Sequence, residues 1–231
     1  MSSSKEKKKQ KTDTVIVVAI IGLVGTILTA AFNSSVIIAW LQKNPESETS
    51  PTNSRSENFL PSSASLFFGP TNGQLQHEAN GGIVDFPAEV SLENFAVEAT
   101  FINPYSSTDH PWIMLLLFRN GFRVWAKSDN EWGAGFMANS IWTDSNSGQL
   151  QDNILFKNSN ESNQLKFIAS DDLGCLYVNN NFVSQINLSG LVQPGNIKVG
   201  VGEQEYTRSG ATTEFRDFSI YTISSISECP K

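Results

Sequence analysis

Acidic residues are the first candidates for chemistry, because two carboxylates about 5–10 Å apart can hydrolyse a glycosidic bond. Such a pair needs acids that project from one face of a strand, at positions i and i+2 or i+4. Glu93 and Glu98 are five residues apart, and Glu214 and Asp217 are three apart. Neither pair shares a face of a regular strand, so we expect solvated acids rather than a glycosidase pair.

Other catalytic and metal-binding signatures are missing from the sequence. Two histidines and two cysteines are too few for the common zinc spacings, and there is no phosphate-binding loop or serine-nucleophile motif. His77 and His110 are predicted to be surface residues. Asp171 and Asp172 are a candidate contribution to a Ca²⁺ site, with hairpin-turn chemistry as the alternative. The pattern favours a non-catalytic protein without a cofactor.

A predicted hairpin supplies the best binding candidate. Asn120-Gly121 is a strong signal for a two-residue loop, which would pair residue 119 with residue 122. In that register one face gathers aromatic and cationic side chains, and the apolar opposite face meets the core. Sugar rings stack on flat aromatic side chains, and nearby cations bind hydroxyl or carboxylate groups. The candidate ligand-binding residues are Trp112, Arg123, Trp125 and Lys127.

The same face has a purely structural alternative. Residues 129–150 contain Trp132 and Trp142, and this segment would cover the face if it packs back across the hairpin. A ligand groove and a covered face therefore both remain open on the sequence.

Cys175 and Cys229 are the only two cysteines of the chain. A disulfide between them would close a loop of about 54 residues and stabilise the fold by roughly 4 kcal/mol in the chain-entropy model. The alternative is a buried thiol at Cys175 and a free thiol at Cys229.

Short strands must position these residues. Residues 95–101 alternate between apolar and polar side chains, which is the period of a half-buried strand. Residues 112–118 are a nearly continuous apolar run, and a second hairpin is predicted around Asp171-Asp172-Leu173-Gly174. No amphipathic helical stretch of useful length separates the strands. The pattern from residue 66 to residue 223 predicts an all-β, two-sheet sandwich, followed by a C-terminal tail at 224–231.

The N-terminal region has the sequence pattern of a membrane anchor. Residues 15–41 contain no charge, and about 20 apolar residues span a bilayer as a helix. Five lysines precede residue 14, so the positive-inside rule predicts a basic cytoplasmic tail at 1–13, a transmembrane helix at 14–41 and an extracytoplasmic C-terminal domain in the cell membrane. A cleaved signal peptide, with Thr29-Ala30-Ala31 at its cleavage site, is the alternative.

Two further features concern partners of the anchored chain. Small or polar residues at four-residue spacing, which let helices approach closely, predict a helix-association face. This face consists of Gly22, Thr26, Ala30 and Asn33. Residues 42–65 are rich in Ser, Pro, Asn and Glu and predict a flexible stalk. The chain after residue 13 holds 11 basic and 21 acidic residues, and this net charge of −10 argues against a nucleic-acid partner.

The order of several residues resembles the concanavalin A-like lectin/glucanase superfamily, and within it the laminin-G-like and 3-keto-disaccharide hydrolase-like domains of bacterial cell surfaces. The resemblance covers about residues 66–223 and implies a jelly-roll topology. It rests on Asn103-Pro104-Tyr105, Trp112, Phe118-Arg119, Trp132, Asn163-Gln164-Leu165, Leu176-Tyr177-Val178-Asn179, Gly200-Val201-Gly202 and Phe215-Arg216-Asp217-Phe218.

Three functions remain open on these observations. The first is a single-pass, membrane-anchored, non-catalytic sandwich that binds carbohydrate or another surface ligand. The second is a structural or assembly subunit of a membrane or cell-surface complex, with a protein partner on the sandwich. The third, a keto-sugar glycoside hydrolase or lyase, is implied only by the resemblance, because one fold hosts many functions.

Overall fold

The computed structural model describes residues 59–78, 82–106, 111–119, 121–138, 141–191, 193–202 and 210–231. The chain divides into two units, Met1–Ser54 and Arg55–Lys231, and the described residues all belong to the second. The predicted cytoplasmic tail, the transmembrane helix with Gly22, Thr26, Ala30 and Asn33, and the stalk up to residue 58 lie outside them. Within the described ranges, no helix is long and apolar enough to cross a membrane.

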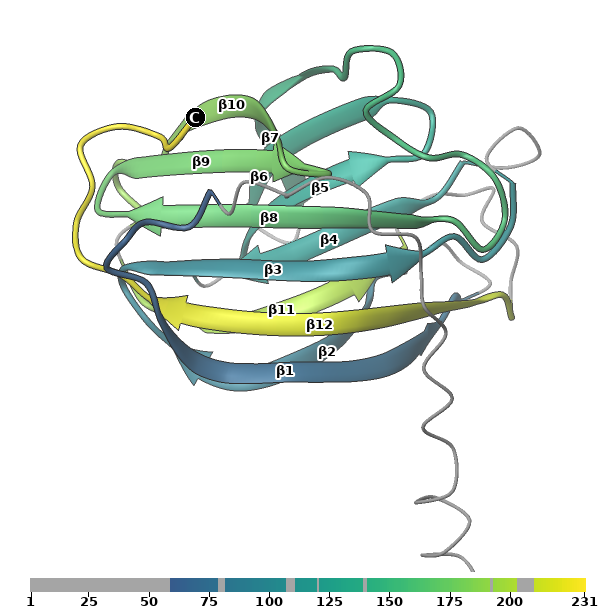
Figure 1. Ribbon diagram of the computed structural model, residues 1–231, viewed down its shortest axis with the longest axis horizontal. Helices are drawn as coiled ribbons and strands as arrows, with labels where there is room; N and C mark the ends of the chain where they lie inside the picture. The colour runs from purple at the N-terminus through teal and green to yellow at the C-terminus, as the bar shows by residue number, and fades with distance from the viewer. Residues whose placement is uncertain are drawn as a thin grey trace, which may run out of the picture. The chain divides into compact units, whose positions relative to one another are not determined.

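Twelve strands form two six-stranded antiparallel sheets in the described residues, and the sheets pack face to face (Figure 1). Sheet A has the order β1-β12-β3-β8-β9-β10, and sheet B has the order β2-β11-β4-β5-β6-β7. This arrangement confirms the predicted all-β, two-sheet sandwich. The strands are β1 (Ser65–Gln76), β2 (Val84–Ser91), β3 (Phe95–Ile102), β4 (Ile113–Phe118), β5 (Phe122–Lys127), β6 (Glu131–Ala138), β7 (Ile141–Gln149), β8 (Ser162–Ser170), β9 (Leu173–Val178), β10 (Asn181–Asn187), β11 (Asn196–Val201) and β12 (Thr212–Thr222).

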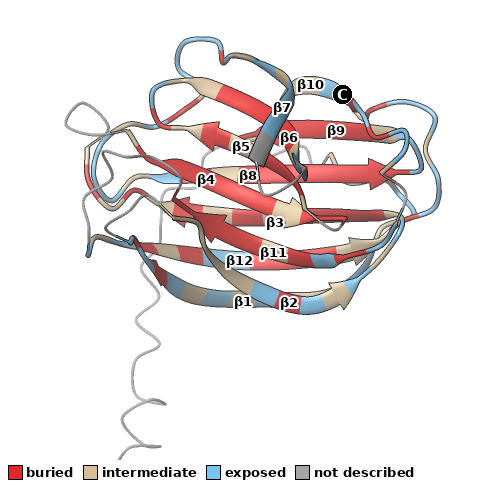
Figure 2. Cartoon of the chain, turned by 180° about the vertical axis from the view of Figure 1, so that it is seen from behind, coloured by how far each residue is buried: buried red, intermediate tan, exposed pale blue. Residues whose placement is uncertain are grey.

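The core lies between the sheets, and the central strands carry most of it (Figure 2). Along β3, Val97 and Phe101 are buried while Glu98 between them is only partly buried, as the alternation predicts. Aromatic rings join the two layers. The Phe118 ring stacks on Phe167 of sheet A at 4.8 Å and meets Phe95 edge to face at 5.3 Å.

The predicted register of the β4–β5 hairpin is wrong by one residue. Phe118 pairs with Phe122 and Leu117 with Arg123, so three residues rather than two separate the last paired positions of the two strands. The Arg119 guanidinium explains the difference, since it donates to the backbone carbonyls of Asp171 (2.8 Å) and Glu93 (2.7 Å) at one end of the sandwich. A core position would have left that charge without these acceptors.

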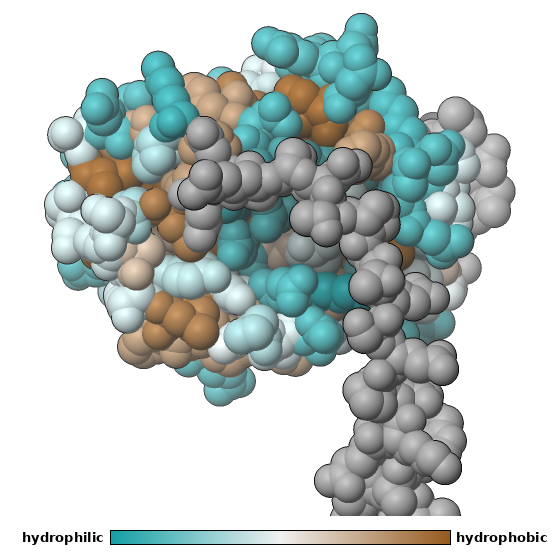
Figure 3. Space-filling model, viewed as in Figure 1, coloured by the Kyte–Doolittle hydropathy of each residue, from teal (hydrophilic) through white to brown (hydrophobic). Residues whose placement is uncertain are grey.

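A second apolar layer covers part of the outer face of sheet A, the side seen in Figure 3, where brown hydrophobic patches lie among teal hydrophilic ones. A disulfide joins Cys175 of β9 to Cys229 of the C-terminal tail, with 5.7 Å between the Cα atoms. The Tyr177 hydroxyl donates to the Pro230 carbonyl at 2.6 Å, which further holds the tail on the sheet.

The end of the predicted stalk belongs to the same layer. The Phe59 ring stacks on Tyr177 with 5.8 Å between centroids, and Leu60 and Ala64 pack against the cluster. These apolar residues at the end of the predicted stalk thus bury surface against the folded body.

Candidate ligand-binding face

The outer face of sheet B brings together most of the residues predicted to bind a ligand. Residues that pair directly across antiparallel strands share a face. Lys198 of β11 pairs with Leu117 of β4, and Leu117 pairs with Arg123 of β5. Arg123 in turn pairs with Gly135 of β6, and Gly135 with Asp144 of β7. These residues form one row across the sheet, and we call this surface the sheet B face.

Trp112 does not belong to the sheet B face. The one-residue shift in register turns the β4 side chains predicted to lie beside Arg123 and Trp125 into the core. The Trp112 side chain is therefore fully buried between the sheets. The predicted covering segment is also wrong, because β6 and β7 extend the sheet beside β5, and Trp132 of β6 lies in the core.

Trp125 is an aromatic residue on the described part of the face, and Gly133 of β6 makes room for it. The two residues pair across the strands, and a methyl group at Gly133 would collide with the indole ring. The indole thus packs closely against the glycine, while its side chain remains only partly buried. Leu115, the partner of Trp125 on the other side, is fully buried.

Arg123 lies deep in the face and contacts an accessible acid. One of its terminal nitrogens, Nη2, is 3.3 Å from Asp144 Oδ1. Burial lowers the pKa of the guanidinium, and the charge and hydrogen bond of Asp144 oppose that shift. A Cβ atom at Gly135 would clash with Asp144, so the absence of a side chain at Gly135 leaves room for the Asp144 carboxylate above the sheet.

Lys127 repeats the arrangement further along β5. Its ammonium lies 2.6 Å from Asp129 and 2.9 Å from Glu131. Burial opposes the charged form, but the hydrogen bonds and charges of the two acids outweigh it and raise the pKa of Lys127. Lys127 is therefore held as a cation at neutral pH.

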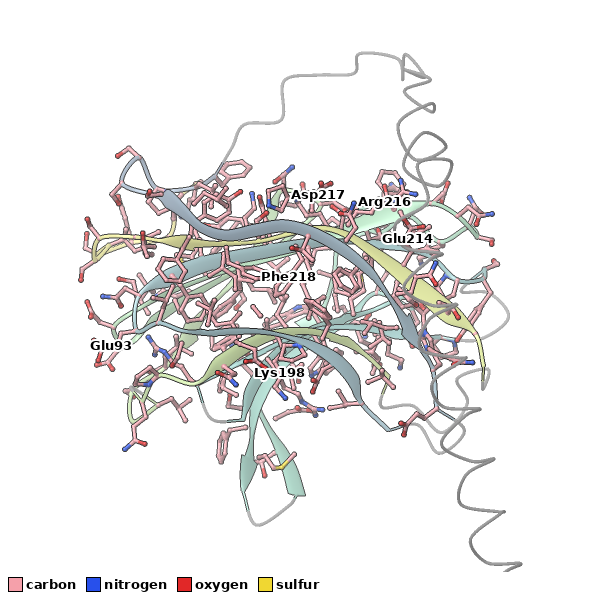
Figure 4. All side chains as sticks on the ribbon, turned by 90° about the horizontal axis from the view of Figure 1, so that it is seen from below. Glu93, Lys198, Glu214, Arg216, Asp217 and Phe218 are labelled. Carbon is pink, nitrogen blue, oxygen red and sulfur yellow. A yellow bond between two sulfur atoms is a disulfide. The ribbon has the colours of Figure 1, made fainter. Side chains whose placement is uncertain are left out.

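A pocket of about 610 Å³ opens beside this row. Its walls include Lys198 and Asp85, whose side chains form an ion pair at 3.1 Å, and Leu117 lies between Lys198 and Arg123. Met137 of β6 adds a half-exposed apolar wall. Figure 4 shows Lys198 on the sheet B side, opposite Glu214, Arg216 and Asp217, with Phe218 between the layers.

Sequence reasoning missed Lys198, Asp85 and the two glycines. β11 joins the face by pairing with the distant β4, and β2 joins it by pairing with β11, more than 100 residues away; no local pattern signals either pairing. The glycines of β6 carried a weak signal, because glycine inside a strand often marks a site where another group approaches closely.

Among the other candidate acids, Glu98 and Glu214 have structural partners. Glu98 accepts from the Tyr221 hydroxyl at 3.0 Å and pairs with buried Lys166 at 3.1 Å. Glu214 pairs with Arg216 at 2.6 Å. Asp171 and Asp172 form the tight loop between β8 and β9. In the described part of the chain, no three His, Cys, Asp or Glu side chains lie close enough together to hold a metal ion.

His77 is buried, contrary to the prediction of a surface residue. Its ring nitrogen Nε2 lies 2.7 Å from the hydroxyl of Thr213 on β12. Burial lowers the pKa of His77 to about 4, so the ring is neutral at pH 7. His110 and the side chain of Trp142 lie outside the described residues.

Comparison with known proteins gives likenesses of structure only. Neither a protein family nor a curated relative matches the sequence. Among solved structures, the chain is similar to the carbohydrate-binding module CBM66 from Bacillus subtilis, with 15% identity over 61% of this chain and 83% of the module and a TM-score of 0.49. Sheep galectin-11 in complex with glycerol is 16% identical over 52% of this chain and 92% of the galectin, with a TM-score of 0.39. The kappa-carrageenase of Pseudoalteromonas carrageenovora is 10% identical over 62% of this chain and 68% of the enzyme, with a TM-score of 0.40. Every score is below 0.5, so these likenesses carry no argument on function.

Proposed function

We propose that the chain is a membrane-anchored, non-catalytic β-sandwich of the concanavalin A-like jelly-roll type that binds carbohydrate on the sheet B face. The observation that carries the proposal is the partly exposed Trp125, which packs against Gly133 on the same sheet face as the accessible Asp144 and as Leu117 and Lys198, two residues that line a pocket of about 610 Å³. Ligand sites of this size combine an apolar surface with a few polar groups.

The chemistry of the face suits a sugar. An indole offers a flat apolar surface to the C–H side of a sugar ring. The flanking carboxylates can accept hydrogen bonds from the hydroxyl groups of a sugar, and the Lys198 ammonium can donate hydrogen bonds to such hydroxyl groups. Direct charged hydrogen bonds of this kind would fix the orientation of a ring that stacks on Trp125.

Replacement of Trp125 by Ala tests the binding site. An anchoring aromatic residue commonly contributes 2 kcal/mol or more, so we expect roughly a thirtyfold loss of affinity for a glycan first identified on an array. Isothermal titration of the full chain in detergent measures the loss. Phe67→Ala is the matched control, because Phe67 is an exposed aromatic residue of β1 in the other sheet. A lower melting temperature with unchanged affinity in Trp125→Ala would show that the indole has a structural role alone.

We further propose that residues 14–41 anchor the chain with its N-terminus in the cytoplasm and its sandwich outside, and that Gly22, Thr26, Ala30 and Asn33 associate in the bilayer. The lysine asymmetry supports this orientation. The Cys175–Cys229 disulfide also supports it, because disulfides persist in oxidising compartments.

Protease treatment of intact cells tests the orientation. We expect an added protease to remove the sandwich and to leave a small membrane-bound fragment, which an antibody against an N-terminal tag detects. A sandwich that stays intact until the cells are lysed would reverse the orientation.

A further inference from the structure

The charges around Arg123 and Lys127 on the sheet B face are arranged in depth, with the cations below and the acids above, whereas Lys198 at the edge of the row is as accessible as its partner Asp85. The Arg123 side chain is 6% exposed, whereas its partner Asp144 is 44% exposed. Lys127 is 12% exposed, and its partners Asp129 and Glu131 are 38% and 42% exposed. A ligand that approaches the centre of the face therefore meets carboxylates before it reaches Arg123 or Lys127.

An anionic sugar is a poor fit to this arrangement. A uronate or sulfate group would have to pass the exposed carboxylates, and like charges repel at contact distance. It would also have to take Arg123 from Asp144, and the buried guanidinium would lose its charged partner. The net charge of −10 after residue 13 adds a long-range repulsion.

A neutral sugar fits the same groups. A hydroxyl both donates and accepts a hydrogen bond, so two adjacent hydroxyls can contact a carboxylate and an ammonium together. The Lys198–Asp85 pair presents this combination at the wall of the pocket, with 34% and 27% of the two side chains exposed. Asp144 adds an accessible acceptor in the same row, beyond Arg123.

We infer that the sheet B face selects neutral sugars and rejects uronate and sulfated ones. Asp144 and Asp85 accept from sugar hydroxyls, Lys198 donates to one, and Arg123 is a positioning residue that holds Asp144 in place. This inference rests on the proposed function, since it names the class of carbohydrate that the same face would bind.

Matched neutral and acidic polysaccharides test the selection. The full chain in detergent is titrated with dextran, laminarin, mannan and galactan, and with dextran sulfate, sulfated laminarin, alginate and polygalacturonate, in 50 to 500 mM NaCl. We expect binding to one or more neutral polymers, with a Kd that changes less than about twofold with salt, because no net charge is neutralised. Tighter binding of an acidic polymer, with a Kd that rises steeply with salt, would overturn the inference and leave the proposed function standing. Binding of neither class would overturn both.

Asp144→Asn tests the role of the exposed acids, since it keeps the shape of the side chain and removes its charge. We expect at least a tenfold loss of affinity for the neutral polymer that binds best, because a hydrogen bond to a charged group is replaced by a weaker one. Asp152→Asn, at an exposed acid of the loop between β7 and β8, is the control. A melting temperature within a few degrees of the parent shows that the variant is folded. Unchanged affinity in a folded Asp144→Asn, or a gain of affinity for the neutral polymer, would overturn the assignment of Asp144.

Discussion

Replacement of Asn163 by Leu should lower the free energy of unfolding by about 4 kcal/mol. The Asn163 amide nitrogen donates to the Asn103 side-chain oxygen and to the Phe156 carbonyl, at 2.8 and 2.9 Å. The Asn163 oxygen accepts from the Phe156 backbone N–H (2.9 Å) and from the Asn179 amide (2.8 Å). Leucine fills a similar volume but takes the partner from the Asn103 side-chain oxygen and from the Phe156 N–H, and each such group costs about 1–3 kcal/mol.

The expected loss is large because the three asparagines act as one network. Asn103 also donates to the carbonyls of Phe156 and Asn158, and Asn179 donates to that of Ile154. The network thus holds the segment between β7 and β8 against β3, β8 and the end of β9. A change at its centre affects all of these contacts.

Urea unfolding of the detergent-solubilised chain, followed by tryptophan fluorescence, measures the effect. Asn181→Ala is the control, since this exposed asparagine donates only to two carbonyls of its own turn. We expect the control to lose less than about 1 kcal/mol. Equal losses in the two variants would contradict a special role for the buried network.

Loss of the Cys175–Cys229 disulfide should have an effect of the same size. The bridge joins residues 54 apart, and a loop of that length stabilises the folded state by about 4 kcal/mol in the chain-entropy model. For a body of this size, we expect the melting temperature to fall by roughly 10 °C in Cys229→Ser. The variant also weakens the packing of Ile226 and the tail against Tyr177.

A reducing agent provides the matched comparison for this prediction. Dithiothreitol should lower the melting temperature of the parent chain towards that of Cys229→Ser and should leave the variant unchanged. The prediction fails if the parent melts at one temperature with and without the reductant while its two thiols are shown to be reduced.

The sequence predicted the architecture because strand signals are local. Alternation placed Val97 and Phe101 in the core, and the turn residues Asp171 and Asp172 lie in the second hairpin as expected. The residues that carry the family resemblance include Asn103, Asn163 and Asn179, which meet in the buried network. Their role could not be predicted, since it depends on three segments that lie far apart in the chain.

The residues of the candidate face were predicted less well than the architecture. Most of the mismatch between the predicted and the observed face comes from the turn between β4 and β5. A separation of three residues instead of two between the last paired positions exchanges the faces of one strand relative to the other, so Trp112 moved to the core while Arg123 and Trp125 stayed on the surface. The observed register is stabilised in part by the hydrogen bonds that Arg119 donates to two backbone carbonyls. Those acceptors come from other loops, and no local pattern contains them.

The position of the last two strands has a consequence for the nascent chain. β12 lies between β1 and β3, and β11 lies between β2 and β4, so the strands synthesised last complete both sheets. β2 has no hydrogen-bonding neighbour in its sheet until β11 is complete at residue 201, and β1 has none until β12 is complete at residue 222, so their edges stay exposed for most of synthesis. Such distant pairings slow folding, because a long loop must close before any contact is gained. The ribosome must therefore release almost the entire chain before the sandwich can close, and chaperones have the longest time to act on β1 and β2.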